Sequence, residues 1–314
     1  KYPIADFEIT PDVAIVDPEL AHTMPKKLVA HTGMDAMTHA IEAYVSTANC
    51  DFTDPLALHA IEMIQADLVG SYNGDMDKRD AMHNAQCLAG MAFSNALLGI
   101  VHSMAHKTGA AFADYGAHII HGAANAMYLP KVIAYNAKDP TAKARYGVIA
   151  DKMHLGGEND DEKVALLIQY LRGMNDDLNI PHCIGHYGPD SYPAEQGFVP
   201  ENVFLERLPE IAKNAIADAC TGSNPRQPTQ EEMEKLLKCC YYDTEVDFQP
   251  PPLCGSYKPP HDLPRPPAFV AGAFCRRKSG QNPCDLIFAD FCCTGRSYSV
   301  RGYFLYKCQI LDFA

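Results

Sequence analysis

The chain has 314 residues, of which 47% are hydrophobic and 21% are charged, and its formal net charge is −13. This composition is typical of a soluble globular protein with one large or two ordinary domains. The negative charge argues against nucleic acid and anionic membranes as partners, because both would repel the chain. No apolar run is long enough to cross a bilayer, and the first residues lack a signal-peptide core, so we expect a cytoplasmic protein.

The predicted elements, taken in chain order, describe a mainly helical protein. Residues 1–24 are expected to be extended, with a short strand at 12–17, where an apolar run lies between two prolines. From residue 25 onward apolar residues recur at helical spacing, and residues 177–199 form a loop rich in proline and glycine. The predicted helices span residues 26–47, 54–71, 78–96, 99–113, 121–136, 139–154, 161–174, 200–219 and 229–242.

Two pairs of polar residues in these helices have the spacing of metal ligands. Asp35 and His39 are four residues apart, as are His102 and His106, so each pair lies on one helix face. Taken alone, each pair is also typical of the polar side of an amphipathic helix. Because both pairs lie among small and apolar residues, and His121 follows in a similar setting, we expect a buried group of side chains that needs a partner. A divalent metal such as Fe²⁺ or Zn²⁺ would satisfy oxygen and imidazole ligands together.

Several strings of the sequence, in a fixed order, resemble one enzyme family. They are TPDVAIVDPEL at 10–20, HTGMDAMTHAIEAYVS at 31–46, GIVHSMAHKTGA at 99–110, HGAANAMYLP at 121–130 and CTGSNPRQPTQEEMEKLLKCCY at 220–241. Together they resemble the iron-containing (group III) alcohol dehydrogenases, and most of all the alcohol dehydrogenase half of bifunctional aldehyde-alcohol dehydrogenases. The resemblance covers residues 1–248. It implies the helical metal-binding domain of the dehydroquinate synthase-like/iron alcohol dehydrogenase fold, preceded by a remnant strand of an α/β Rossmann-like domain.

The resemblance also implies roles for individual residues. The metal ligands of the family fall on Asp35, His39, His102 and His121. His106 matches a histidine that lines the cleft of the metal and the nicotinamide without ligating, so we expect it to act in catalysis and cofactor binding. The loop before His121 is longer than the family pattern and holds a second candidate, His118, but His121 has the matching His-Gly-x-x-Asn string.

The function implied by the resemblance is the interconversion of a primary alcohol such as ethanol and its aldehyde, with Fe²⁺ (or Zn²⁺) and NAD(P) as cofactors. The metal would act as a Lewis acid on the alcohol oxygen. His106 would relay the alcohol proton, or would shape the cleft wall for the cofactor. The parent enzyme is expected to be a homo-oligomer, and a filament if it is bifunctional.

One expected part of such an enzyme has no match in the sequence. A dinucleotide binds at a glycine-rich turn after a strand, and the 314 residues contain no Gly-x-Gly-x-x-Gly string. The chain is therefore interpreted as a fragment. Residues 1–24 would be a remnant of the dinucleotide-binding domain and 25–248 the complete helical metal-binding domain, and the chain by itself would show little turnover.

The last segment, 249–314, is rich in proline and cysteine and matches no family string. It is interpreted either as an appended or disordered segment, or as aberrant out-of-frame sequence. The out-of-frame interpretation is favoured, because the segment lacks apolar periodicity. Six of the twelve cysteines lie in it, without a Cys-x-x-Cys pair, and the other six are expected to be reduced thiols.

Two alternative functions stay open from the sequence. A zinc-dependent relative of glycerol dehydrogenase would share the helical metal domain, and ligand identity alone does not separate iron from zinc. A non-catalytic metal-binding or assembly module would explain the missing glycine-rich turn.

Overall fold

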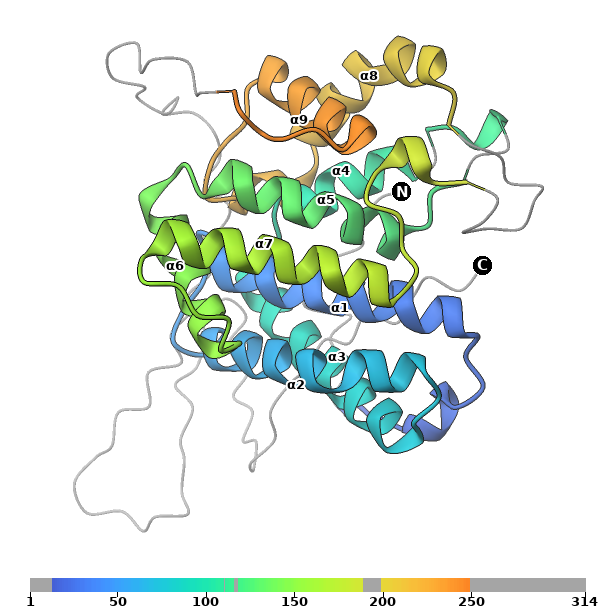
Figure 1. Cartoon of the computed structure of the whole chain (residues 1–314), viewed down its shortest axis with the longest axis vertical. Helices are drawn as coiled ribbons and strands as arrows, with labels where there is room; N and C mark the ends of the chain where they lie inside the picture. Colours follow the sequence, from blue (N-terminus) through green and yellow to red (C-terminus); the bar gives the residue numbers. More distant parts are fainter. Residues whose placement is uncertain (1–12, 110, 116–117, 189–198, 249–314) are drawn as a thin grey trace, which may run out of the picture.

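The computed structural model describes residues 13–109, 111–115, 118–188 and 199–248, and all regular secondary structure within these ranges is helical (Figure 1). The predicted all-helical body is thereby confirmed. The α-helices of the described residues are α1 (Lys26–Val45), α2 (Asp54–Tyr72), α3 (Met76–Ala96), α4 (Ile100–Thr108), α5 (His121–Asn136), α6 (Pro140–Lys152), α7 (Asp160–Asp177), α8 (Glu201–Ile216) and α9 (Gln230–Tyr242). Short 3₁₀ turns lie at η2 (Pro18–Ala21), η3 (Ala113–Tyr115), η4 (Ile184–His186) and η6 (Ala219–Ser223).

The predicted strand at 12–17 is wrong for residues 13–17, which have no regular structure. Val13 and Ile15 are 72% and 87% exposed, so these two apolar side chains are not packed in the core. A strand needs a neighbouring backbone for its hydrogen bonds, and no described segment offers one. Residues 1–12 and the segment 249–314 lie outside the described residues, so the domain boundaries inferred from the sequence stay predictions.

Helix α1 is the centre of the arrangement. It packs against α2 and α3 on one side and against α5 on the other, while α7 packs on α5 and α6, and α8 contacts α4 and α9 (Figure 1). Small residues allow this, since a Cβ at Gly33 would lie 2.1 Å from the side chain of Leu68 on α2. Gly33 thus lets α1 lie close to α2, while Asp35 and His39, on another side of α1, are partly buried.

Four of the nine α-helices in the described residues begin at a side-chain cap. The side chains of Asp75, Asp139, Asn159 and Thr229 each accept a hydrogen bond from a backbone N–H of the first turn. In α9 the cap is a complete capping box, because Glu232 also accepts from the backbone N–H of Thr229 at 3.0 Å. These starts agree with the predicted ones to within two residues.

The helix predicted at 99–113 is shorter in the structure, because α4 ends at Thr108 and the turn η3 follows. Arg207 of α8 donates to the backbone oxygen of Ala111 and forms two hydrogen bonds with the carboxylate of Asp114, at 2.7 and 2.5 Å. These contacts from a distant helix hold the segment 111–115 outside α4. The sequence pattern had no means of indicating them.

A sharp corner between α3 and α4 directs α4 into the core. Leu97 has a left-handed backbone, with φ of 64°, and the two helices are bent by 103° at this break. The corner is held by Ser46, whose hydroxyl donates to the backbone oxygen of Ala96, and by Ser223, whose hydroxyl donates to that of Leu98 at 2.6 Å. Within the described part of the chain no single helix is long and apolar enough to cross a membrane, although α3 and α4 would be if taken together.

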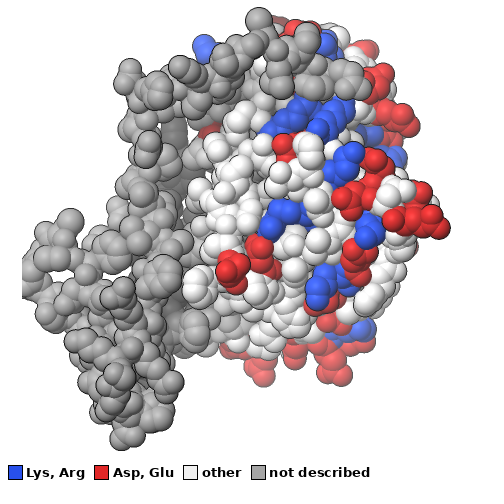
Figure 2. Space-filling view, turned by 90° about the vertical axis from the view of Figure 1, so that its left-hand side faces the viewer, with Lys and Arg blue, Asp and Glu red and all other residues white. Residues whose placement is uncertain are grey.

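The surface carries charges of both signs. On the face in Figure 2, Lys and Arg are interspersed with Asp and Glu, and acidic side chains line its edge. Ion pairs such as Lys143–Asp161 (2.5 Å) and Lys163–Asp151 (2.7 Å) join partly buried lysines to exposed carboxylates.

Candidate metal centre

Three helices bring the predicted site residues together. Asp35 and His39 come from α1, His102 and His106 from α4, and His121 is the first residue of α5. The ring centroids are 4.5 Å apart for His39 and His102, 5.3 Å for His102 and His121, and 5.2 Å for His106 and His121. Residues more than eighty positions apart in the chain thus meet at one point.

The donor atoms converge around the carboxylate of Asp35. Its Oδ1 lies 3.5 Å from Nε2 of His102 and 3.5 Å from Nε2 of His121. Donor atoms of Asp35, His39 and His102 also lie within 4.8 Å of one another. One carboxylate oxygen and three imidazole nitrogens form a ligand set that suits Fe²⁺ or Zn²⁺.

Asn125, one turn after His121 on α5, is directed at the same point. Its amide nitrogen lies 2.5 Å from Oδ1 of Asp35 and 3.2 Å from Nε2 of both His102 and His121. Its carbonyl Oδ1 is buried without a hydrogen-bond partner among the described residues. A polar atom left in this way is unusual in a folded interior, and it supports a further group in the site.

The electrostatics of the cluster favour a cation. Burial would raise the pKa of Asp35, but the neighbouring His39 and His121 hold it well below its usual range. Burial lowers the pKa of His39 to about 3, so this imidazole is neutral near pH 7 and offers a lone pair. Burial opposes the charging of His102, yet its hydrogen bonds to Asp35 and Glu42 raise its pKa to about 9. A metal at this point would compete with that proton and release it.

His118 lies apart from this cluster. Its side chain is exposed, and its backbone oxygen is 3.5 Å from the hydroxyl of Tyr187. His121, in contrast, faces the carboxylate of Asp35. The geometry therefore supports the preference for His121, while the ligand roles themselves stay predictions.

The position of His121 depends on the glycine that follows it. A Cβ at Gly122 would lie 2.2 Å from the backbone oxygen of His31 and 2.7 Å from its carbonyl carbon. The first turn of α5 thus contacts the backbone of α1 directly. Gly122 allows this approach, which brings His121 within reach of Asp35.

His106 lies next to the predicted ligands with a carboxylate behind it. Its Nδ1 is 3.3 Å from Oδ2 of the buried Asp218, and Lys107 Nζ is 2.8 Å from the same oxygen. Burial would raise the pKa of Asp218, but hydrogen bonds from His106 and Lys107 hold it well below its usual range. Cys220 also lies near this carboxylate, but the Lys107 ammonium already neutralises Asp218, so a second metal is disfavoured here.

The sequence analysis missed three residues of the site: Glu42, Asn125 and Asp218. Glu42 lies three residues after His39 and seven after Asp35, which places all of them on one helix face, so helical spacing could have indicated it. Asn125 ends the His-Gly-x-x-Asn string that begins at His121, and its place one helical turn after His121 could have indicated it. Asp218 comes from a distant segment, and only the folded chain brings it to His106.

The ring of Phe93 stacks on His39 with centroids 4.4 Å apart and supplies an apolar wall beside the cluster.

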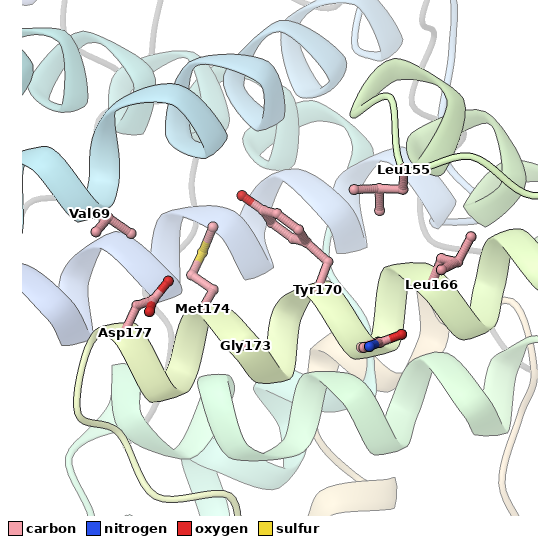
Figure 3. A pocket seen from close by; sticks show the side chains of 8 residues that line it. Val69, Leu155, Leu166, Tyr170, Gly173, Met174 and Asp177 are labelled. Atoms are coloured by element: carbon pink, nitrogen blue, oxygen red, sulfur yellow. The ribbon is translucent and has the colours of Figure 1, made fainter.

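A shallow groove between α2 and α7, lined by residues that include Val69, Leu155 and Tyr170, is shown in Figure 3. None of the predicted ligands lines this groove, so it is not part of the candidate site.

Comparison with known proteins gives a consistent set of matches. The model of the Fe-containing alcohol dehydrogenase family, C-terminal, matches residues 29–241. The NADPH-dependent butanol dehydrogenase of Clostridium saccharobutylicum is 56% identical over 248 residues, which cover 79% of this chain and 60% of that protein. The bifunctional aldehyde-alcohol dehydrogenase AdhE of Escherichia coli K12 is 40% identical over 260 residues, covering 77% of this chain and 28% of that protein. The identity to the butanol dehydrogenase thus exceeds the identity to the bifunctional enzyme.

Solved structures agree with the sequence matches. An iron-containing alcohol dehydrogenase from Thermococcus thioreducens matches with a TM-score of 0.65 and 33% identity, over 76% of this chain and 57% of that one. A 1,3-propanediol oxidoreductase matches with a TM-score of 0.62 and 32% identity, over 72% of this chain and 55% of that one. The chain therefore spans between half and two thirds of these proteins.

Proposed function

Since the chain belongs to the Fe-containing alcohol dehydrogenase family, we propose that its helices form the metal-binding part of an NAD(P)-dependent alcohol dehydrogenase. One observation carries the proposal: a carboxylate and three imidazoles from α1, α4 and α5 converge on one point, where His102 is buried and the other side chains are partly buried. The metal-binding unit comprises residues 25–248, and its ligands are Asp35, His39, His102 and His121. When bound, the metal supplies a Lewis acid for an alcohol or carbonyl oxygen.

The side chains around the ligands have separate tasks. Asp35 contributes a negative charge that offsets part of the metal charge. The histidine ligands are neutral, so the metal remains a good electrophile. Asp218, being a carboxylate, accepts a hydrogen bond from Nδ1–H of His106 and leaves Nε2 of that ring to accept a proton from the substrate side. Phe93 and the surrounding apolar residues keep water away from the site.

The substrate and setting of the enzyme belong to the same proposal. A short primary alcohol, such as ethanol or butanol, and its aldehyde are the reactants, and NAD or NADP is the coenzyme. The names of the similar proteins support this choice, as butanol dehydrogenase and aldehyde-alcohol dehydrogenase are among them. A cytoplasmic location is supported by the free thiols of the six cysteines in the described residues. Assembly into a homo-oligomer, or into a filament in a bifunctional parent, is also proposed.

Metal binding tests the proposal directly. The 314-residue protein, purified without oxygen, should bind one Fe²⁺ or Zn²⁺ tightly, and elemental analysis will tell which metal it retains. Replacing Asp35, His39, His102 or His121 with alanine should abolish tight binding, because each removes one ligand. His118→Ala is the matched control and should bind as the wild type does. Loss of binding in His118→Ala together with normal binding in His121→Ala would overturn the ligand assignment.

Activity tests the second half of the proposal. We expect little turnover from the 314 residues alone, because they contain no glycine-rich dinucleotide turn. Joined to the N-terminal residues of the butanol dehydrogenase that precede the matched region, they should reduce NADP⁺ in the presence of butanol. The rate should vanish with a chelator or with His39→Ala. A joined protein that binds metal and both substrates but never turns over would contradict the proposal.

A further inference from the structure

Glu42 is a buried carboxylate that touches one of the predicted ligands. It lies on α1, is 3% exposed, and is held among the helices that form the metal centre. Its Oε2 is 2.5 Å from Nδ1 of His102, and its Oε1 accepts a hydrogen bond from the backbone N–H of Val101 at 2.8 Å. His102 is its one ion-pair partner among the described residues. The contacts of the buried Glu42 carboxylate are thus with one histidine, His102, and with the first turn of α4.

The surroundings show that this contact is built into the fold. A Cβ at Gly99 would lie 2.7 Å from Oε1 of Glu42 and 2.8 Å from Oδ1 of Asn224, so only glycine leaves room for both side chains. Asn224 in turn accepts from the backbone N–H of Ile100 at 3.3 Å. The first turn of α4 is therefore capped by two side chains, and only one of them also reaches a histidine.

We infer that Glu42 is a positioning residue, which holds His102 with its proton on Nδ1 and directs Nε2 toward Asp35 and His121. A carboxylate can only accept hydrogen bonds, so the His102 nitrogen that faces it must be the donor. The other nitrogen, Nε2, then keeps its lone pair for a metal. The contact also fixes the rotation of the ring, and its negative charge makes the imidazole a stronger ligand. This inference rests on the proposed function, because it concerns the same metal centre.

The same side chain couples the ligand to the backbone that carries it. Glu42 binds the N–H of Val101 and the ring of the next residue, His102, with its two oxygens. It also shares α1 with Asp35 and His39. One helix therefore contributes two predicted ligands and sets the direction of a third.

The test uses the 314-residue protein, with zinc as the probe, and replaces Glu42 by glutamine. Glutamine keeps the size of the side chain, but it presents an acceptor to only one of the two N–H groups. The affinity for Zn²⁺ should fall roughly 10–100-fold, the range typical for loss of an outer partner of a metal-bound histidine. In wild type the Nδ1 proton of His102 should exchange slowly with water, as seen in ¹⁵N–¹H NMR spectra of the histidine rings in the zinc form. In Glu42→Gln this proton should exchange faster.

Asn224→Ala is the comparison variant, because it removes the neighbouring cap of α4, together with hydrogen bonds to Asn136 and to the backbone oxygen of Arg226, but none to a histidine. It should keep the His102 proton signal and most of the zinc affinity. If Glu42→Gln binds zinc as the wild type does, or if Asn224→Ala loses as much affinity, the positioning role is overturned. Should Glu42→Gln not fold, Glu42→Asp, which withdraws the carboxylate by one methylene, is expected to give the same two losses. Failure of the wild type itself to bind zinc would instead refute the proposed function.

Discussion

Asp243 joins three helices through one carboxylate. It follows α9 in the left-handed conformation, with φ of 56°. Lys131 of α5 lies 2.7 Å from its Oδ1, and Arg172 of α7 donates to both oxygens at 2.8 and 2.9 Å. These hydrogen bonds, first from Arg172 and also from Lys131, hold the pKa of Asp243 well below its usual range, against the opposing effect of burial. The residue thus ties α9 to the helix that carries His121.

Replacing Asp243 with asparagine should destabilise the protein in a pH-dependent way. Asparagine tolerates the left-handed backbone, so the change removes mainly the charge. Since the folded pKa is below the unfolded one, the contribution is present above about pH 4 and is lost as pH falls through the folded pKa. We expect the free energy of unfolding in urea to fall by roughly 1–3 kcal/mol at pH 7, and the difference from wild type to shrink at pH 3.

Asp161→Asn supplies the control for that experiment, because the Asp161 side chain in its pair with Lys143 is 79% exposed. Exposed pairs contribute little, so its unfolding curve should match that of the wild type at both pH values. An Asp243→Asn protein with the same deficit at pH 3 as at pH 7 would show that packing, and not charge, explains the loss.

At the scale of elements, the start of α5 is the feature on which the site most depends. Its first residue is His121, and its second, Gly122, contacts the backbone of α1 at His31. Asn125 lies one turn further along the same helix and reaches Asp35. A small displacement of this end would move two side chains of the candidate metal site, His121 and Asn125, at once.

Gly122→Ala should therefore damage both stability and metal binding. The added Cβ would meet backbone atoms of α1, which cannot rotate away as a side chain can, so α5 must shift. We expect a loss of roughly 1–3 kcal/mol in the free energy of unfolding, as for other overpacked cores, and a weaker affinity for Zn²⁺. Urea unfolding and a zinc titration measure the two effects.

Gly90→Ala on α3 is the comparison that isolates this contact. A Cβ there would meet nothing within 4 Å, so the substitution should leave stability unchanged or raise it by about 0.5–1 kcal/mol through helix propensity. Equal losses in the two variants would argue that glycine is needed at both positions for its backbone freedom and not for a close approach.

In the arrangement of all the described helices, the candidate metal site lies where α1, α4 and α5 meet. α1 packs between the α2–α3 pair and α5, and α4 turns inward at the corner after α3 (Figure 1). The described body ends with Phe248, whose ring lies 6.1 Å from that of Tyr135 and 5.0 Å from Nζ of Lys138. Phe248 thus belongs to the packed body, as the family resemblance through residue 248 implies.

Removal of residues 249–314 should leave the melting temperature nearly unchanged, within about 2 °C for a protein of this size. The reason is that this segment has no periodic apolar face that could pack on the body. Thermal melts of the two proteins decide the matter. Phe248→Ala in the shortened protein should lower the melting temperature, and a large drop from the truncation alone would show that the segment packs on the helices.

From the sequence alone most of the helices could be predicted, and a set of metal ligands could be proposed, but Glu42, Asn125 and Asp218 were not indicated. Apolar periodicity and capping residues such as Asp75 and Thr229 act locally, so they are visible in the chain itself. The spacing of Asp35 and His39, and of His102 and His106, is a property of a single helix and was equally visible. The family strings then selected His121 over His118.

The contacts between distant side chains, and the two predicted elements that were wrong, became known only from the folded structure. The end of α4 depends on Arg207 from α8, and the segment 13–17 is not a strand because no described backbone pairs with it. The roles of Glu42 and Asp218 likewise depend on contacts with residues 60 and 112 positions away. Such contacts follow from how helices pack in three dimensions, and periodicity along one helix carries no information about them.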